Sequence, residues 1–281
     1  MGDWPEWEIG KTDDGKKVLQ SVYGQTFLLG EESKCLLKPP VDIEDAAEYQ
    51  EPDINKVTGD LVAKYAEETD FFVFAQVGGP ISMLNEMYPM EDYMVNCITY
   101  PEETHMLSEK VIAFEIKKAK LFLDRGADAI LIADDMAFNT GVFLPPYVME
   151  ENVYPFYKQM IQEIKAYKNV PVFLHSDGNL NSVMNHLVEC GFDGIQSIQP
   201  SAGMDIRSIK ERYGVRLCLW GNIDLDYIMC FGSTEEVKAD VRNTIEAAGT
   251  AGGFILSNCN TMVDLIPPEH IFAMIRDADR S

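Results

Sequence analysis

The sequence predicts an α/β fold built from repeated βα units, as in a (β/α)8 barrel or a doubly wound parallel sheet. From residue 71 onward, short apolar runs alternate with longer segments of helical character. The apolar runs are continuous, which is typical of strands buried on both faces of a parallel sheet. The predicted strands are Phe71–Val77, Ala129–Ala133, Val170–His175, Gly194–Ile198, Val215–Trp220 and Gly253–Ser257.

Helices are expected between these runs, and some of their first turns carry clear signals. Pro101, followed by Glu102 and Glu103, places a fixed φ and negative charge in a first helical turn. Ser233 and Glu236 have the spacing of a capping box. We expect helices over residues 101–124, 148–167, 179–190, 204–213, 233–248 and 267–277.

A weak internal repeat marks two returns from helix to strand. Arg-Gly-Ala-Asp-Ala-Ile begins at Arg125, and Cys-Gly-Phe-Asp-Gly-Ile begins at Cys190. The glycines of the two copies, Gly126 and Gly191, can adopt the left-handed conformation that ends a helix before a tight turn. The repeat therefore favours successive βα units.

The first 70 residues do not continue this pattern. They contain a predicted hairpin of Lys17–Tyr23 and Thr26–Leu29, a Pro-containing acidic loop over Lys38–Asp53, and a helix over 54–69. The predicted strands are then about two fewer than the eight of a closed barrel. We expect a single domain in which residues 1–70 pack on a barrel of residues 71–281. That barrel would be partial, irregular at its N-terminal opening, or completed by another chain, as in a homo-oligomer.

Composition narrows the class of function. The chain has 281 residues, with 46 Asp plus Glu against 23 Lys plus Arg, and a net charge of −23. A hydrophobic content of 46% is enough for a sizeable core. The acidity argues against nucleic-acid or membrane-surface binding, because phosphate binding needs clustered Lys and Arg. No arginine precedes Arg125, so the first part of the chain is poorly equipped to hold a polyanionic substrate.

The sequence also bears on the cellular compartment. The start, Met1–Glu6, has no basic segment followed by an apolar one, which argues against a secretory signal. No apolar run approaches the roughly 18 residues needed to span a bilayer. The 6 cysteines include no Cys-x-x-Cys pair and are expected to be reduced thiols. We therefore expect a cytoplasmic protein.

Polar residues follow the predicted strands where they end. Ligands bind at the carboxyl ends of the strands in both kinds of βα fold, so these positions are the candidate site. A purely structural protein has no need for a polar residue at every strand exit. The candidates are Gln76, Asp134, Asp135, His175, Asp177, Gln196, Gln199, Asn222, Asp224 and Cys259.

Three of these residues have the chemistry of zinc ligands. The imidazole of His175, the carboxylate of Asp177 and the thiolate of Cys259 suit Zn²⁺, and three protein ligands leave one position for substrate. The alternative is a hydrogen-bonded histidine, a helix N-cap and a core thiol. Of the adjacent Asp134 and Asp135, we expect one to point into the site as a proton acceptor, further ligand or substrate anchor. The other would cap a turn.

Four segments together resemble the uroporphyrinogen decarboxylase superfamily: Arg125–Asp135, Val170–Asn179, Gly221–Asp224 and Gly253–Asn260. The similarity runs from about residue 71 to the C-terminus and implies a TIM (β/α)8-type barrel. One branch of the superfamily, the uroporphyrinogen decarboxylases, uses no cofactor and holds its tetrapyrrole with N-terminal arginines, which are absent here.

The other branch contains zinc-dependent methyltransferases that serve corrinoid (cobalamin) proteins. Their zinc ligands follow a His-x-Cys…Cys pattern. In this chain His175 and Cys259 match the first and last ligands, and Asp177 replaces the middle cysteine. A carboxylate donates less charge than sulfur and leaves zinc the stronger Lewis acid. Such a site suits activation of an oxygen or nitrogen leaving group better than activation of a thiol.

The resemblance therefore implies transfer of a methyl group from a small O- or N-methyl donor to the cobalt of a partner corrinoid-binding protein. Asp134 or Asp135 would orient substrate or assist proton transfer. The pocket would be lined by Gln76, Gln196, Gln199, Asn222 and Asp224. Two alternatives stay open: a metal-free lyase of the decarboxylase type, and a degenerate barrel that binds a ligand or partner without catalysis.

Overall fold

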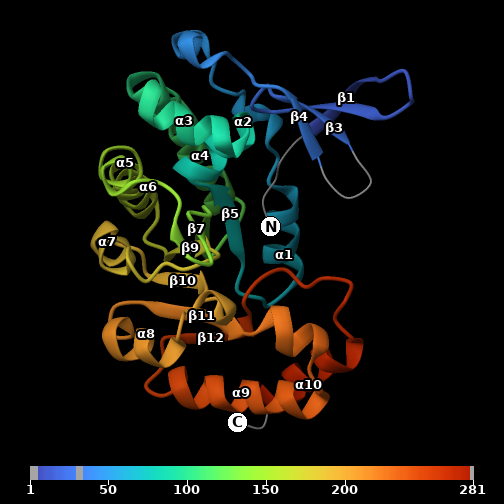
Figure 1. Cartoon of the computed structure of the whole chain (residues 1–281), viewed down its shortest axis with the longest axis vertical. Helices are drawn as coiled ribbons and strands as arrows, with labels where there is room; N and C mark the ends of the chain where they lie inside the picture. Colours follow the sequence, from blue (N-terminus) through green and yellow to red (C-terminus); the bar gives the residue numbers. More distant parts are fainter. Residues whose placement is uncertain (1–5, 30–33, 279–281) are drawn as a thin grey trace. The chain divides into compact units, whose positions relative to one another are not determined.

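The computed structural model describes residues 6–29 and 34–278, which form two compact units. The first unit ends at Asp134 and resumes over Leu144–Val170. The second contains Asp135–Phe143 and continues from Pro171 (Figure 1). The start of the chain, used above to argue against a secretory signal, lies outside the described residues as far as Pro5.

The N-terminal part of the first unit is an antiparallel sheet with strand order β1-β2-β3-β4. Its strands are β1 (Glu6–Lys11), β2 (Lys17–Ser21), β3 (Thr26–Leu29) and β4 (Lys34–Lys38). The predicted hairpin is confirmed as β2 and β3, with Gly24 at φ +95° in the turn. Strands β1 and β4 were not predicted, although β1 alternates polar and apolar residues from Glu6 to Ile9.

The rest of the first unit contains a parallel pair of strands, β5 (Phe74–Gly78) and β6 (Ala129–Ala133). The predicted helix over residues 101–124 is confirmed as α4. The predicted helix over 148–167 is two helices, and Pro155, which has no N–H to donate, lies in the first turn of the second. The helices are α1 (Asp60–Glu68), α2 (Pro80–Met87), α3 (Met90–Thr99), α4 (Pro101–Asp124), α5 (Pro146–Asn152) and α6 (Tyr154–Tyr167), with short 3₁₀ turns η1 (Ile43–Glu48) and η2 (Ile54–Lys56).

The second unit contains a parallel sheet in which β9, β10, β11 and β12 are neighbours in that order. These strands are β9 (Val172–Ser176), β10 (Gly194–Ser197), β11 (Cys218–Ile223) and β12 (Phe254–Asn258). A two-residue-strand hairpin, β7 (Ala137–Phe138) and β8 (Gly141–Val142), precedes them. Strands β9 to β12 lie within a few residues of their predicted positions, whereas β7 and β8 were not predicted.

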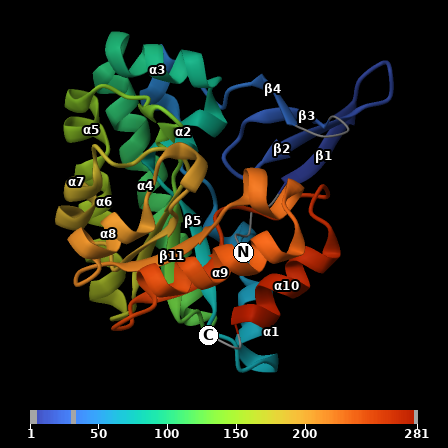
Figure 2. The same ribbon diagram turned by 60° about the horizontal axis from the view of Figure 1, so that its bottom comes forward.

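The helices of the second unit are α7 (Met184–Cys190), α8 (Ile206–Tyr213), α9 (Thr234–Ala248) and α10 (Pro268–Ala278), with short turns η3 (Pro200–Ala202) and η4 (Leu225–Met229). Helices α9 and α10 lie side by side in both views (Figures 1 and 2). Val237 and Val241 of α9 and Met274 of α10 are buried in one cluster with Ile223 and Met229. The predicted capping box of α9 is confirmed, with both Ser233 and Glu236 hydrogen bonds present.

The internal repeat has the same structural role in both units. Gly126 and Gly191 both have φ +98°, in the left-handed region; Gly126 lies two residues after the end of α4, and Gly191 one residue after the end of α7. The aspartate that follows each glycine accepts a hydrogen bond from a backbone N–H at a neighbouring strand. Asp128 accepts from Val73 (2.8 Å), and Asp193 accepts from Val172 (2.7 Å). The repeated Gly-x-Asp therefore ends a helix and fixes the following strand against its neighbour.

The parallel strands of the described chain are therefore β5 and β6 in the first unit and β9 to β12 in the second. Residues 6–70 form a four-stranded antiparallel sheet where the sequence predicted only a hairpin, and the predicted helix over 54–69 is the short turn η2 followed by α1. Their described part adds no further parallel strands. Within residues 6–29 and 34–278, no helix combines the length and apolar character needed to cross a membrane.

Candidate functional site

Three side chains of the second unit lie close together: His175 and Asp177 at the end of β9, and Asp135 shortly before β7. One ligand atom from each lies within 4.8 Å of those of the other two. His175 Nε2 is 3.8 Å from Asp135 Oδ1, and the backbone N–H of Asp177 donates to the same oxygen (2.9 Å). Two ligand atoms around tetrahedral zinc are separated by about 3.3 Å, so this group needs little rearrangement to hold a cation.

The orientation of His175 is fixed by the next strand. Gln196 on β10 is its partner in the parallel register, and His175 Nδ1 is hydrogen-bonded to Gln196 Oε1. An amide oxygen can only accept, so Nδ1 carries the proton and Nε2 is left as the basic nitrogen. Nε2 is the nitrogen nearest Asp135. An outer hydrogen bond of this kind is the usual way in which proteins orient a metal-binding histidine.

Asp177 is held at both of its oxygens. Ser197 Oγ donates to Oδ1 at 2.6 Å, and Asn260 Nδ2 donates to Oδ2. Burial raises the pKa of Asp177, the Ser197 hydrogen bond and His175 oppose that rise, and the nearby Asp135 and Asp226 carboxylates add to it. The site thus places several carboxylates around a single imidazole. A divalent cation bound there would neutralise the negative charge of these carboxylates.

Cys259, the third predicted zinc ligand, lies at the end of β12 but outside the Asp135–His175–Asp177 group found among the described residues. Its thiol belongs to a buried side chain, and burial raises its pKa to about 11. Its backbone oxygen accepts from Gln196 Nε2 at 3.5 Å. The structure therefore brings two of the three predicted ligands together and adds Asp135 to them.

Asp134 belongs to the first unit and has a different environment from its neighbour in sequence. It is fully buried at the end of β6 and accepts hydrogen bonds from the backbone N–H groups of Ser82 (2.5 Å) and Ile81 (3.3 Å), at the N-terminus of α2. Tyr157 on α6 also donates to it (2.5 Å). Burial raises the pKa of Asp134 to about 7, against the pull of these hydrogen bonds. Of the adjacent pair, Asp134 is the one that caps, and Asp135 joins the histidine.

The predicted pocket-lining residues have varied roles. Gln199 accepts from the N–H of Gly178 (3.0 Å) and donates to Asp226 (3.2 Å). Asp224 caps η4 by accepting from the N–H groups of the following turn, at 2.6 and 3.0 Å. Gln76 lies on β5 in the first unit and lines a pocket there. Gln196 and Gln199 thus lie beside the histidine and aspartate group, whereas Asp224 is committed to its helical turn.

The exit of β10 has an unusual backbone. Ser197 and Ile198 have φ of 99° and 52°, values that side-chain-bearing residues rarely adopt, least of all a β-branched one. Asn222 Nδ2 donates to the carbonyl of Ile198 at 2.5 Å and holds this segment. Strain of this kind concentrates at functional sites, and here it aims the Ser197 hydroxyl at Asp177.

Sequence reasoning missed three side chains of this site: Ser197, Asp226 and Asn260. Ser197 and Asn260 bond to Asp177, and Asp226 accepts from Gln199 and Ser201. Asn260 was visible as one of several polar residues after the last strand. Ser197 and Asp226 carried no signal beyond their closeness in sequence to predicted residues.

Comparisons with known proteins identify the family to which this chain is similar. The family model for uroporphyrinogen decarboxylase (URO-D) matches residues 18–280. A methylcobamide:CoM methyltransferase, MtaA, from Methanosarcina barkeri is 24% identical over 215 residues, covering 75% of this chain and 58% of the relative. A uroporphyrinogen decarboxylase from Chlorobium luteolum is 29% identical over 150 residues, covering 53% of this chain and 40% of the relative. The chain thus spans less than two thirds of the length of these relatives.

A solved structure, a methyltransferase from Methanosarcina mazei, shares the fold. Its TM-score is 0.77 at 19% sequence identity, over 92% of this chain and 76% of that one. The predicted α/β fold of the TIM (β/α)8 type is therefore confirmed in class. Because the family model extends over nearly the whole sequence, this chain belongs to the uroporphyrinogen decarboxylase (URO-D) family.

Proposed function

We propose that the chain is a methyltransferase of a corrinoid system, which moves a methyl group from a small O- or N-methyl donor to the cobalt of a partner corrinoid-binding protein. The observation that carries the proposal is the group of Asp135, His175 and Asp177 in the second unit. The methylcobamide:CoM methyltransferase among the relatives supports the corrinoid part of the proposal. The absence of disulfides among the 6 cysteines fits a cytoplasmic setting.

The donor set fits zinc. Imidazole nitrogen and carboxylate oxygen are both established zinc donors, and His175 Nε2 is the nitrogen left basic by the Gln196 hydrogen bond. Zinc, when bound, would act as a Lewis acid toward an oxygen or nitrogen of the substrate. His175 and Asp177 are zinc ligands both in the set that the family resemblance implies and in the set that the geometry favours. The third is Cys259 by resemblance and Asp135 by geometry.

The chain's own residues would bind and orient the donor. Gln199 is a candidate for this role, because its side-chain amide accepts from the N–H of Gly178 and donates to Asp226. In the transfer, the bond between the methyl carbon and its oxygen or nitrogen breaks, a cobalt–carbon bond forms with Co(I), and the leaving atom gains a proton. If Cys259 is the third ligand, Asp135 would be free of the metal and placed to relay that proton, since its Oδ1 lies 3.8 Å from His175 Nε2 and its side chain is exposed.

A carboxylate-rich site favours removal of a methyl group from an O- or N-methyl donor over methylation of a thiol. The named relative couples a methylcobamide to CoM, so the corrinoid is common to both reactions while the small molecule differs. Hard oxygen donors leave the metal more electron-poor than thiolates would. A basic oxygen or nitrogen leaving group gains most from such a site.

Metal analysis of the full chain, purified without added zinc, tests the site. We expect near-stoichiometric zinc that is lost in both His175→Ala and Asp177→Ala. Comparing Asp135→Ala with Cys259→Ala identifies the third ligand, since only the variant that removes a ligand loses zinc. Asp226→Asn, which alters a nearby carboxylate outside the group, should keep its metal. Zinc that never binds at any loading would refute the metal site.

Methyl transfer is measured separately, from the visible spectrum of cob(I)alamin mixed with protein and a panel of methyl ethers and methylamines. Conversion to methylcobalamin with one donor, lost in His175→Ala, is the expected result. If zinc binds and no donor in any class is demethylated, the binding-only alternative gains and the transferase proposal fails.

The decarboxylase relatives make a lyase the second candidate. Uroporphyrinogen is a polyanion, and the first arginine of this chain is Arg125. We expect neither binding nor turnover of uroporphyrinogen, and release of CO₂ from it would favour the lyase.

A further inference from the structure

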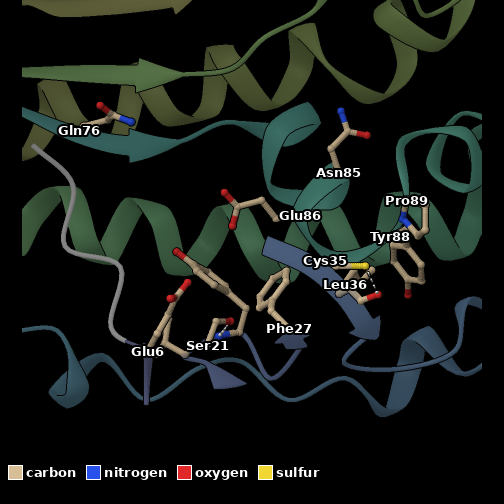
Figure 3. A pocket seen from close by; sticks show the side chains of 12 residues that line it. Glu6, Ser21, Phe27, Cys35, Leu36, Gln76, Asn85, Glu86, Tyr88 and Pro89 are labelled. Atoms are coloured by element: carbon tan, nitrogen blue, oxygen red, sulfur yellow. Dashed lines mark hydrogen bonds between the residues drawn. The ribbon is translucent and has the colours of Figure 1, made fainter. Parts of the chain in front are cut away.

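The first unit contains a pocket of about 760 Å³ that the proposed transfer chemistry does not use (Figure 3). Residues of the N-terminal strands form one part of its wall, and residues of β5 and α2 form another. Its volume lies in the range of sites for small organic ligands.

The charge of the pocket wall is negative. Glu6 and Glu86 both line it, and none of the described lining residues is Lys, Arg or His. Figure 3 shows Glu86 extending from α2, and Phe27 from the N-terminal strands, into the space between these elements. The net charge of −23 adds a long-range attraction for cations. An anionic ligand is disfavoured here on both counts.

The same wall is rich in aromatic rings. Tyr23, Phe27 and Tyr88 line the pocket. The face of an aromatic ring attracts a cation, and its apolar surface accommodates alkyl groups. Lys118, whose Nζ is 5.7 Å from the centre of the Tyr23 ring, is paired with Glu115 at 2.7 Å. Because that ion pair is internally neutral, it does not repel a cation in the pocket.

An unsatisfied acceptor lies in the wall as a second, independent observation. Asn85 lines the pocket, and its buried Oδ1 has no hydrogen-bond partner among the described residues. Buried carbonyl oxygens of proteins are nearly always hydrogen-bonded. A ligand that brings an O–H or N–H donor would complete this one.

We propose that this pocket binds a small alkylammonium cation that also carries a hydrogen-bond donor. The two carboxylates would balance its charge, the three rings would contact its alkyl groups, and Asn85 would accept its donor. The inference stands on the pocket alone and needs neither zinc nor methyl transfer. A binding measurement therefore tests it whatever becomes of the proposed function.

The test compares choline with 3,3-dimethylbutan-1-ol, which has the same shape and hydroxyl but no charge. Binding to the full chain is measured by calorimetry and by ligand-observed NMR. We expect choline to bind at least about tenfold more tightly than the alcohol. Glu86→Gln should weaken choline by about tenfold and leave the alcohol unchanged, and Tyr88→Leu should weaken choline as well.

Glu67→Gln is the matched control, because Glu67 is an exposed carboxylate on α1 that does not line the pocket. It should leave the affinity for choline unchanged. Glu86 is also exposed, so its Gln variant should fold, which thermal unfolding checks. Equal affinity for choline and the alcohol, no binding of choline at millimolar concentration, or equal losses in Glu67→Gln and Glu86→Gln would each overturn the proposal.

Discussion

His175 Nδ1 is hydrogen-bonded to Gln196 Oε1, and the two residues are register partners on adjacent parallel strands. The sheet itself therefore sets the tautomer of the histidine. Because strand pairing fixes the two Cα positions, the imidazole keeps Nε2 toward Asp135 without help from a loop.

Replacing Gln196 by Leu should lower zinc affinity by about 10- to 100-fold, because the ring loses the acceptor that orients it. Gln196→Glu keeps an acceptor in place and should retain most of the affinity. Competition with a chromogenic chelator measures both. If the Leu variant binds zinc as tightly as the unaltered chain, Gln196 does not position the histidine.

Asp134 predicts a specific dependence of stability on pH. Its pKa of about 7 in the folded chain lies above the ordinary aspartate value of 3.8. The folded state then keeps a proton that the unfolded state releases between these two values, so stability falls as pH rises through this window. Ionisation of Asp134 lowers the free energy of unfolding by at most roughly 4 kcal/mol. This loss is complete above pH 7 and absent below about pH 4.

Asp134→Asn removes this contribution and keeps an acceptor for the N-terminus of α2. Urea unfolding at several pH values should show a smaller fall in stability between about pH 4 and 7 in the variant than in the unaltered chain. Equal slopes in the two proteins would mean that Asp134 is ionised in the folded state.

Some of this site could be predicted from sequence, for identifiable reasons. Continuous apolar runs and glycine turns located the strands, and the strand ends then brought His175, Asp177 and Gln196 into one candidate set. The different roles of Asp134 and Asp135 could not be predicted, because they depend on which of the two carboxylates accepts hydrogen bonds from the N-terminus of α2. Ser197 was missed because its φ of 99° is a property of the folded backbone. Helices α2 and α3 were missed because they are short and joined at Pro89.

A buried ion pair in the first unit should matter for stability. Lys118 and Glu115 lie 2.7 Å apart, are almost completely buried, and both hydrogen-bond to Tyr23. Glu115 also accepts from the N–H of Gly78 at 2.6 Å. Removing one partner leaves an uncompensated buried charge, so Lys118→Met should destabilise the chain by about 3–5 kcal/mol.

The double variant Glu115→Gln, Lys118→Met should be less destabilised than the sum of its single variants, because no isolated charge remains. The exposed pair of Lys238 and Glu235 is the matched control, and Lys238→Met should leave the urea midpoint nearly unchanged. Additive effects of Glu115 and Lys118 would contradict this account.

Gly79 has a steric reason to be glycine, because a Cβ at this position would overlap the Asp134 carboxylate. Gly79→Ala should therefore destabilise the chain by about 1–3 kcal/mol. Gly10→Ala is the control, since no atom lies within 4 Å of a Cβ at that position. Combining Gly79→Ala with Asp134→Gly, which removes the Asp134 Cβ together with the carboxylate, relieves the overlap, so the double variant should lose less than the two single losses added together. Strictly additive losses, measured by urea unfolding, would show that the methyl group is accommodated elsewhere and that the two residues do not constrain each other.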